Sequence, residues 1–161
     1  MTRSELEIII KKRAAIVITT FAALLAINTM VGGSNSGKVL TNTIAANNVW
    51  AWYQAKNVRS VVYATTADAA LSKDVAAHYN AEAKRMKADM VELEAKAKQL
   101  EAERDAAKQR SVFFTYAGSA LQIGIVLSTA AILAVTMPLF WASVGVGSVG
   151  AVLFAFGQFG V

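Results

Sequence analysis

The chain has 161 residues, 55% of them hydrophobic, and a formal net charge of +5 at pH 7. It contains no cysteine, which excludes disulfides, thiolate metal sites and cysteine nucleophiles. Its basic residues are interspersed with acidic ones, whereas a nucleic-acid-binding surface would gather basic residues alone, so we expect no nucleic-acid partner. Residues 14–37 and 111–161 contain no charged side chain. Because a charge at the centre of a bilayer costs about 3 kcal/mol, these stretches predict membrane-spanning helices.

Residues 1–32 are predicted to form an N-terminal segment and the first transmembrane helix, with the span at about 14–31. The sequence Gly-Gly-Ser-Asn-Ser-Gly at residues 32–37 predicts a loop that ends this helix.

Residues 33–110 are predicted to form an extramembrane helical hairpin, with arms at about 41–71 and 75–110 and a turn near residues 71–74. In the second arm, small or apolar residues recur alternately four and three apart, as in a coiled coil, and only Arg104 breaks the series. They are Tyr79, Ala83, Met86, Met90, Leu93, Ala97, Leu100 and Ala107. We predict a matching seam on the first arm, made of Ile44, Ala51, Ala55, Val58, Val62 and Ala69, with Asn48 and Thr65 at the remaining positions.

Residues 111–161 are predicted to form a transmembrane hairpin, with spans at about 111–137 and 139–159 separated by Pro138. The expected fold is therefore an all-α membrane protein with three transmembrane helices. An antiparallel, coiled-coil-like helical hairpin outside the membrane lies between the first and second spans.

Small residues occur every four positions in both of these spans. They are Ala120, Gly124 and Ser128 in one, and Ser143, Gly147, Ala151 and Ala155 in the other. Such rows let helix backbones approach closely in lipid. Together with Gly145, Gly150 and Gly157 they offer more surface than one hairpin uses, so we expect a homo-oligomer or a larger membrane complex.

Two amides, Asn28 and Gln122, lie well inside the predicted spans. We expect each to form an interhelical hydrogen bond. The alternative is that they line a pore or contact a ligand.

The densest aromatic cluster, Trp50, Trp52 and Tyr53, lies on the first arm beside Gln54 and Lys56. Trp50 and Tyr53 share a helix face and Trp52 lies on another. We expect this cluster to pack against the second arm or a neighbouring subunit, with a ligand or lipid contact as the alternative. Among the seam residues, Met86, Met90, Leu93 and Leu100 are the main candidates for stalk or partner contacts.

Gly32, Gly37 and Lys38 have the spacing of the first seven positions of a phosphate-binding P-loop. The next residue is Val39, so the hydroxyl that would hold magnesium is missing, and a predicted span precedes the motif where a P-loop needs a strand. We therefore expect no nucleotide, and no cofactor or metal site is predicted.

The run Trp50-Ala51-Trp52-Tyr53-Gln54-Ala55-Lys56 resembles the W-A-x-Y-Q-A-K signature of the bacterial domain-of-unknown-function 4337 family. Residues 121–125, Leu-Gln-Ile-Gly-Ile, are similar to the family's opening of its second span. The resemblance implies one span, two helices and then two closely spaced spans. The basic residues that the family often has between its last two spans are absent around Pro138. The resemblance implies no activity.

We expect a non-enzymatic structural or accessory subunit of a membrane assembly, and an oligomeric pore-former, either a channel or a phage holin-like protein, is the alternative. The bilayer expected is a bacterial inner membrane. Lys11, Lys12 and Arg13 favour a cytoplasmic N-terminus with the hairpin outside.

Overall fold

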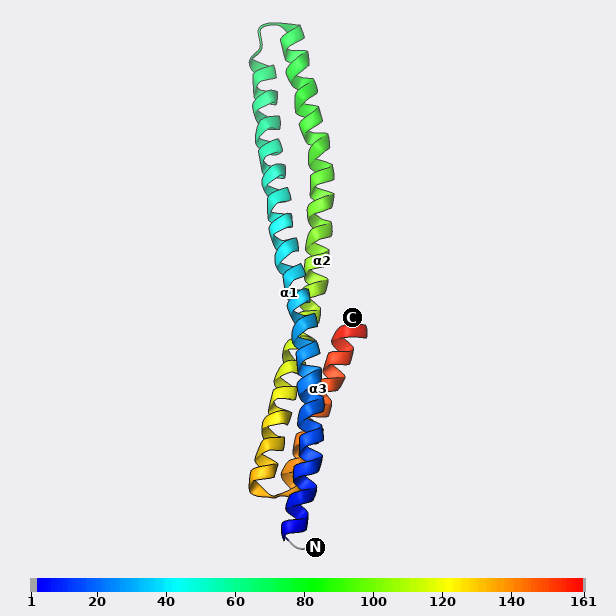
Figure 1. Cartoon of the computed structure of the whole chain (residues 1–161). Coiled ribbons are helices and arrows are strands. Elements are labelled where there is room, and N and C mark those ends of the chain that lie inside the picture. The colour runs from blue at the N-terminus through cyan, green and yellow to red at the C-terminus, as the bar shows by residue number, and fades with distance from the viewer. Residues whose placement is uncertain (1–2, 161) are drawn as a thin grey trace. The chain divides into compact units, whose positions relative to one another are not determined.

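The computed structural model describes residues 3–160, and every regular element in that range is an α-helix (Figure 1). The helices are α1 (Arg3–Ala69), α2 (Lys73–Ala134) and α3 (Met137–Phe159). Each of the three is long and apolar enough to cross a membrane. The all-helical class predicted from the sequence is confirmed.

The chain divides into two compact units, which are described separately. The three-helix unit comprises the chain up to Gly37 and from Ala106 onward, and the two-helix unit comprises Lys38–Asp105.

Helix α1 continues through residues 32–37, so the predicted loop there and the separate helix start near Thr41 are wrong. Tertiary contacts outweigh the low helix propensity of this stretch. The Asn35 side-chain amide donates to the Ala107 carbonyl at 2.6 Å and to Ser111 Oγ at 2.8 Å. Gly32 lies so close to Phe114 that a Cβ there would be 3.2 Å from the Phe114 Cβ. A helix containing glycine fits this place better than a loop does.

The two turns fall close to where the sequence places them. Residues 70–72 separate α1 from α2, and the Ala76 N–H donates to the Ser72 carbonyl at 3.0 Å as α2 begins. Pro138 lies in the first turn of α3, where its missing N–H removes no helical hydrogen bond.

Helix α2 ends at Ala134, and the next residue, Val135, is in a left-handed conformation with φ of 52°. The Thr136 N–H donates to the Ala131 carbonyl at 3.3 Å, which is the long hydrogen bond of a Schellman ending. Glycine usually occupies this position, and a residue with a Cβ costs about 1–2 kcal/mol there. Val135 instead packs against a buried cluster that includes Ile10 and Phe140, which offsets part of that cost.

The centre of the three-helix unit is a close approach of α2 and α3. A Cβ on Gly124 would lie 3.0 Å from the Gly147 Cα, and a Cβ on Gly147 would lie 2.0 Å from the Phe21 ring. Phe21 belongs to α1 and is buried. One aromatic ring therefore fills the space that two glycines leave open, and it joins all three helices.

Most of the small residues are used inside the chain. A Cβ on Gly150 would come within 3.0 Å of Leu121, and one on Gly157 within 3.0 Å of Phe113. Gly145 has nothing within 4 Å of that position, and Ala155 is exposed. The surplus of close-packing surface expected from the sequence is thus much smaller than the pattern suggests.

In the two-helix unit, the seam predicted on α2 from Tyr79 to Leu100 is confirmed, because each of its residues is buried or half-buried. The seam predicted on α1 is wrong. All eight of its positions, which we call the outer row, are exposed: Ile44, Asn48, Ala51, Ala55, Val58, Val62, Thr65 and Ala69.

The α1 residues that do face α2 form an inner row on the opposite side of the helix. It consists of Ala46, Trp50, Tyr53, Lys56, Ser60, Tyr63 and Ala67, all buried or half-buried. Tyr63 meets Tyr79 of α2 with ring centroids 5.8 Å apart. The row combines large amphipathic side chains with small ones, and it is less aliphatic than the outer row.

The glycine contact gives the first testable prediction. Gly147→Ala should lower the free energy of unfolding by about 1–3 kcal/mol, because the new methyl group collides with the buried Phe21 ring. Gly145→Ala is the matched control and should change it by less than about 0.5 kcal/mol. Helicity followed during heating in detergent measures both. Phe21→Leu should recover part of the loss in the Gly147→Ala background, and equal losses at the two glycines would contradict the contact.

Candidate functional site

The Asn28 side chain is a buried amide of the three-helix unit and is 4% exposed. Its Nδ2 donates to the Phe114 carbonyl of α2 at 2.9 Å, so the interhelical hydrogen bond expected for Asn28 is present. Its Oδ1 is buried and has no hydrogen-bond partner within the described residues. Gln122, the other predicted amide, is exposed.

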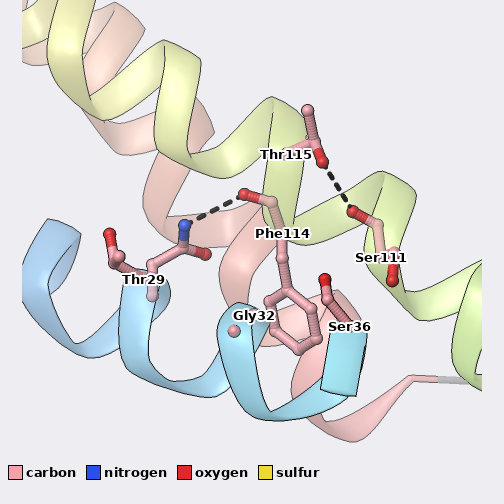
Figure 2. Close-up of a pocket in the computed structure, with 8 residues that line it drawn as sticks. Thr29, Gly32, Ser36, Ser111, Phe114 and Thr115 are labelled. Atoms are coloured by element: carbon pink, nitrogen blue, oxygen red, sulfur yellow. Dashed lines mark hydrogen bonds between the residues drawn. The ribbon is translucent and has the colours of Figure 1, made fainter. Parts of the chain in front are cut away.

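A hollow of about 150 Å³ lies beside this hydrogen bond. Figure 2 shows the Phe114 ring next to Gly32 and Ser36 of α1, with Ser111 and Thr115 of α2 on the other side. The Ser111 and Thr115 hydroxyls already donate to backbone carbonyls of their own helix. The hollow has no charged lining residue and no free nucleophile activated by a base, so it offers no group for acid–base or covalent chemistry.

Two further predicted residues, Ser128 and Ser143, bond to one another across α2 and α3. Their hydroxyl oxygens are 2.8 Å apart and both side chains are fully buried. Ser143 also donates to the Phe140 carbonyl at 2.8 Å, so Ser128 supplies the proton of the pair. These hydroxyls are satisfied within the chain.

The remaining predicted small residues differ in exposure. Gly124 and Gly147 are buried at the helix contact described above, Ala120 and Ala151 are half-buried, and Ala155 is exposed.

In the two-helix unit, Trp50 and Tyr53 face α2, as the shared-face prediction requires. The Trp50 indole N–H donates to a Glu101 carboxylate oxygen at 3.0 Å, and the Tyr53 ring meets Trp50 edge-on with centroids 5.3 Å apart. Trp52 points away and is 68% exposed, and Gln54 is exposed. The aromatic cluster therefore has an internal half and an external half.

The seam residues of α2 lie between the two arms. Met86 is buried, and Met90, Leu93 and Leu100 are half-buried. These positions suit contacts within the stalk, and a contact of these residues with a partner stays a prediction.

An ion pair also joins the arms. Lys56 Nζ lies 2.6 Å from Asp89 Oδ2. The hydrogen bond from Lys56 lowers the pKa of Asp89, assisted by the positive charges of Lys56 and Arg85, against the opposing effect of desolvation. Elsewhere on α2, Glu94 raises the pKa of Lys98 in the same way. These are surface pairs that support helix packing, and no group of His, Asp and Glu within residues 3–160 could hold a metal ion.

Sequence reasoning missed three features. Phe21 is the only aromatic residue in the uncharged stretch 14–37, which is a usable signal for a ring packed on glycine. Asn35 was assigned to a loop, although an amide beside a helix can bridge to its backbone. The third feature is the exposed outer row, which was mistaken for the seam.

The two tryptophans allow a matched comparison. Trp50→Phe removes the indole hydrogen bond to Glu101 and should lower the free energy of unfolding by about 1 kcal/mol. Trp52→Phe changes an exposed ring and should leave it within about 0.5 kcal/mol. Thermal unfolding of the full chain measures both, and a larger loss for Trp52→Phe would contradict the assignment of the two faces.

The Asp89 pair predicts a pH effect. A lowered pKa means that Asp89 stabilises the folded state at a pH above its ordinary pKa, near 3.8, and that this contribution disappears as the pH falls through the folded-state pKa. Lys56→Met should move the pKa of Asp89 upward toward its ordinary value, whereas Lys96→Met, on an exposed position, should not. Carboxyl ¹³C NMR of aspartate-labelled protein measures the shift. An unchanged Asp89 pKa in Lys56→Met would show that the pair does not form in solution.

Comparisons with known proteins give one match. A family model described as a domain of unknown function (DUF4337) matches residues 10–160. No curated protein and no solved structure matches the chain. Because the match covers almost all of the sequence, including all three apolar stretches, the chain belongs to the domain-of-unknown-function 4337 family.

Proposed function

We propose that this chain is an integral membrane protein that acts as a non-enzymatic structural or accessory subunit of a membrane assembly. The observation that carries the proposal is the surface of the three-helix unit. Residues 14–37 and 111–160 have no charged side chain, yet large apolar residues there are exposed, among them Ile16, Met30, Leu133, Val152 and Phe156. A water-soluble protein rarely exposes so much contiguous apolar surface, whereas a bilayer covers it.

The polar chemistry of the chain supports a structural role. Asn28, Ser128 and Ser143 bond to other helices of the same unit, and Lys56 and Trp50 bond across the two-helix unit. Each of these groups holds helices together, and none is paired with a second group in the way that a nucleophile or a general acid requires.

The proposed setting is a bacterial inner membrane with the N-terminus in the cytoplasm and residues 38–105 outside. Lys11, Lys12 and Arg13 next to the first apolar stretch support this orientation. Lys38, Arg104, Lys108 and Arg110 oppose it, but long polar segments are translocated largely regardless of their charge.

The alternative, an oligomeric pore-former, has less support. It needs Asn28, Gln122, Ser128 and Ser143 to line a shared lumen. Three of these are buried within a single chain and hydrogen-bonded there, and only Gln122 is exposed. An interior without charges, in which Asn28, Ser128 and Ser143 already bond within the chain, gives an ion little to replace its hydration shell.

Native mass spectrometry of the protein, released gently from its own membranes, tests the proposal. We expect a complex that contains more than one polypeptide, either an integer multiple of the chain mass of 17.1 kDa or a larger complex with unrelated subunits. A chain released only as a monomer at every detergent concentration would contradict the assembly role. Conductance of the purified protein in planar bilayers would favour the pore-former instead.

A further inference from the structure

The outer row of α1 has the spacing of a coiled-coil seam but has no partner within the two-helix unit. Its positions, 44, 48, 51, 55, 58, 62, 65 and 69, alternate four and three apart, and all of them are exposed. Val58 is 62% exposed, and the adjacent Val61 and Trp52 extend the same uncharged face. A second helix of matching period fits this face.

The charges of the two-helix unit are distributed very unevenly. The α1 segment from Lys38 to Ala69 has four charged residues, namely Lys38, Lys56, Arg59 and Asp68, and none lies in the outer row. The α2 segment from Lys73 to Asp105 has fifteen. The outward face of α2 is therefore suited to water, and the outward face of α1 is suited to burial against an uncharged surface.

We propose that the outer row binds the outer row of a second copy of this chain, as a parallel, in-register pair of α1 helices. The parallel direction rests on the proposed function, because copies inserted with one topology in one bilayer present α1 in the same direction. In this register Asn48 occupies a core position and meets Asn48 of the second copy. A single buried asparagine pair of this kind specifies a parallel dimer and fixes its register.

The flanking residues are compatible with this arrangement. In a parallel pair, a residue just before one core position lies near the residue five places later on the other helix. Gln54 then faces Arg59 of the second copy, and Val61 faces Thr66 of the second copy. No like charges oppose each other, and Trp52 lies at the edge of the buried strip, where an aromatic ring adds contact area.

The area of the outer row determines whether the dimer is stable in solution or only in a membrane. The row spans the 26 residues from 44 to 69, or about 38 Å of helix, and a strip about 11 Å wide gives roughly 400 Å² per copy. A standard stable interface buries about 800 Å² per partner. The row alone therefore gives a weak pair in solution, and it requires copies that are already concentrated in one membrane.

The chain has no cysteine, so single-cysteine variants report directly on contacts between copies. Ala51→Cys and Val58→Cys, made in the full chain and oxidised in native membranes, should give disulfide-linked dimers. Val91→Cys is the matched control, because Val91 is a 70% exposed valine on the outward face of α2, and Asn57→Cys is an exposed control on α1 itself. We expect at least tenfold more dimer for Val58→Cys than for either control.

Three results would overturn the inference. The first is equal cross-linking at positions 58 and 91, and the second is cross-linking to a protein of different mass. The third is cross-linking only between different positions, such as 44 and 69, because that pattern indicates antiparallel helices. If native mass spectrometry still shows an assembly in any of these cases, the outer-row dimer fails while the proposed function stands. A monomer by mass spectrometry together with strong cross-linking at position 58 would retain the contact and reject the larger assembly.

Charge and register variants provide a second readout with Ala51→Cys as the reporter. Val58→Glu should reduce its dimer at least tenfold, whereas Val91→Glu should leave it unchanged. Both positions are exposed, so both variants should retain wild-type helicity by circular dichroism. Asn48→Val should keep the dimer but allow new cross-links between shifted positions, because the asparagine that fixes the register is lost. If Val58→Glu left the cross-linking of Ala51→Cys unchanged, the outer row would not be the surface that binds the second copy.

Discussion

The three-helix unit depends on the contact among Gly124, Gly147 and Phe21. In the proposed membrane setting, apolar side chains gain nothing by leaving lipid for protein, so helices must associate through close van der Waals packing and a few hydrogen bonds. The two glycines bring α2 and α3 together, and the Phe21 ring fills the space that remains between them and α1. The Ser128–Ser143 hydrogen bond also joins α2 to α3, and the Asn28–Phe114 hydrogen bond joins α1 to α2.

The features that are local in sequence were predictable. The uncharged stretches gave the apolar helices, Pro138 gave the break between α2 and α3, and charged residues on both sides of Met86 and Leu93 left only one possible buried face for α2. The failed loop at residues 32–37 has a non-local cause. Helix propensity argued for a break, but the bonds of Asn35 to Ala107 and Ser111 join residues more than seventy positions apart, and no local pattern reveals them.

The candidate site was half predictable for a similar reason. Trp50 and Tyr53 were correctly placed on one face, but the buried row of α1 was assigned to the wrong side. That arm carries two rows at helical spacing, one with three aromatic residues and one with three Val or Ile residues, and it has few charges to show which row meets water. Aliphatic content favoured the wrong row. The choice depends on long-range partners such as Glu101, Asp89 and Tyr79, whose positions only the folded hairpin supplies.

The unbroken course of α1 through residues 32–37 has a consequence for the local dynamics of the helix. A Cβ built on Gly33 or on Gly37 would have no neighbouring atom within 4 Å. Each glycine in a helix interior makes the helix less stable by about 1 kcal/mol relative to alanine. Within this stretch, Gly32 lies against Phe114 and Asn35 bonds to α2. We expect the backbone hydrogen bonds of this stretch to open transiently while those on either side stay closed, which makes the segment a boundary between two cooperatively folding regions. The residues that resembled a loop in the sequence would then mark the point where one helix behaves as two.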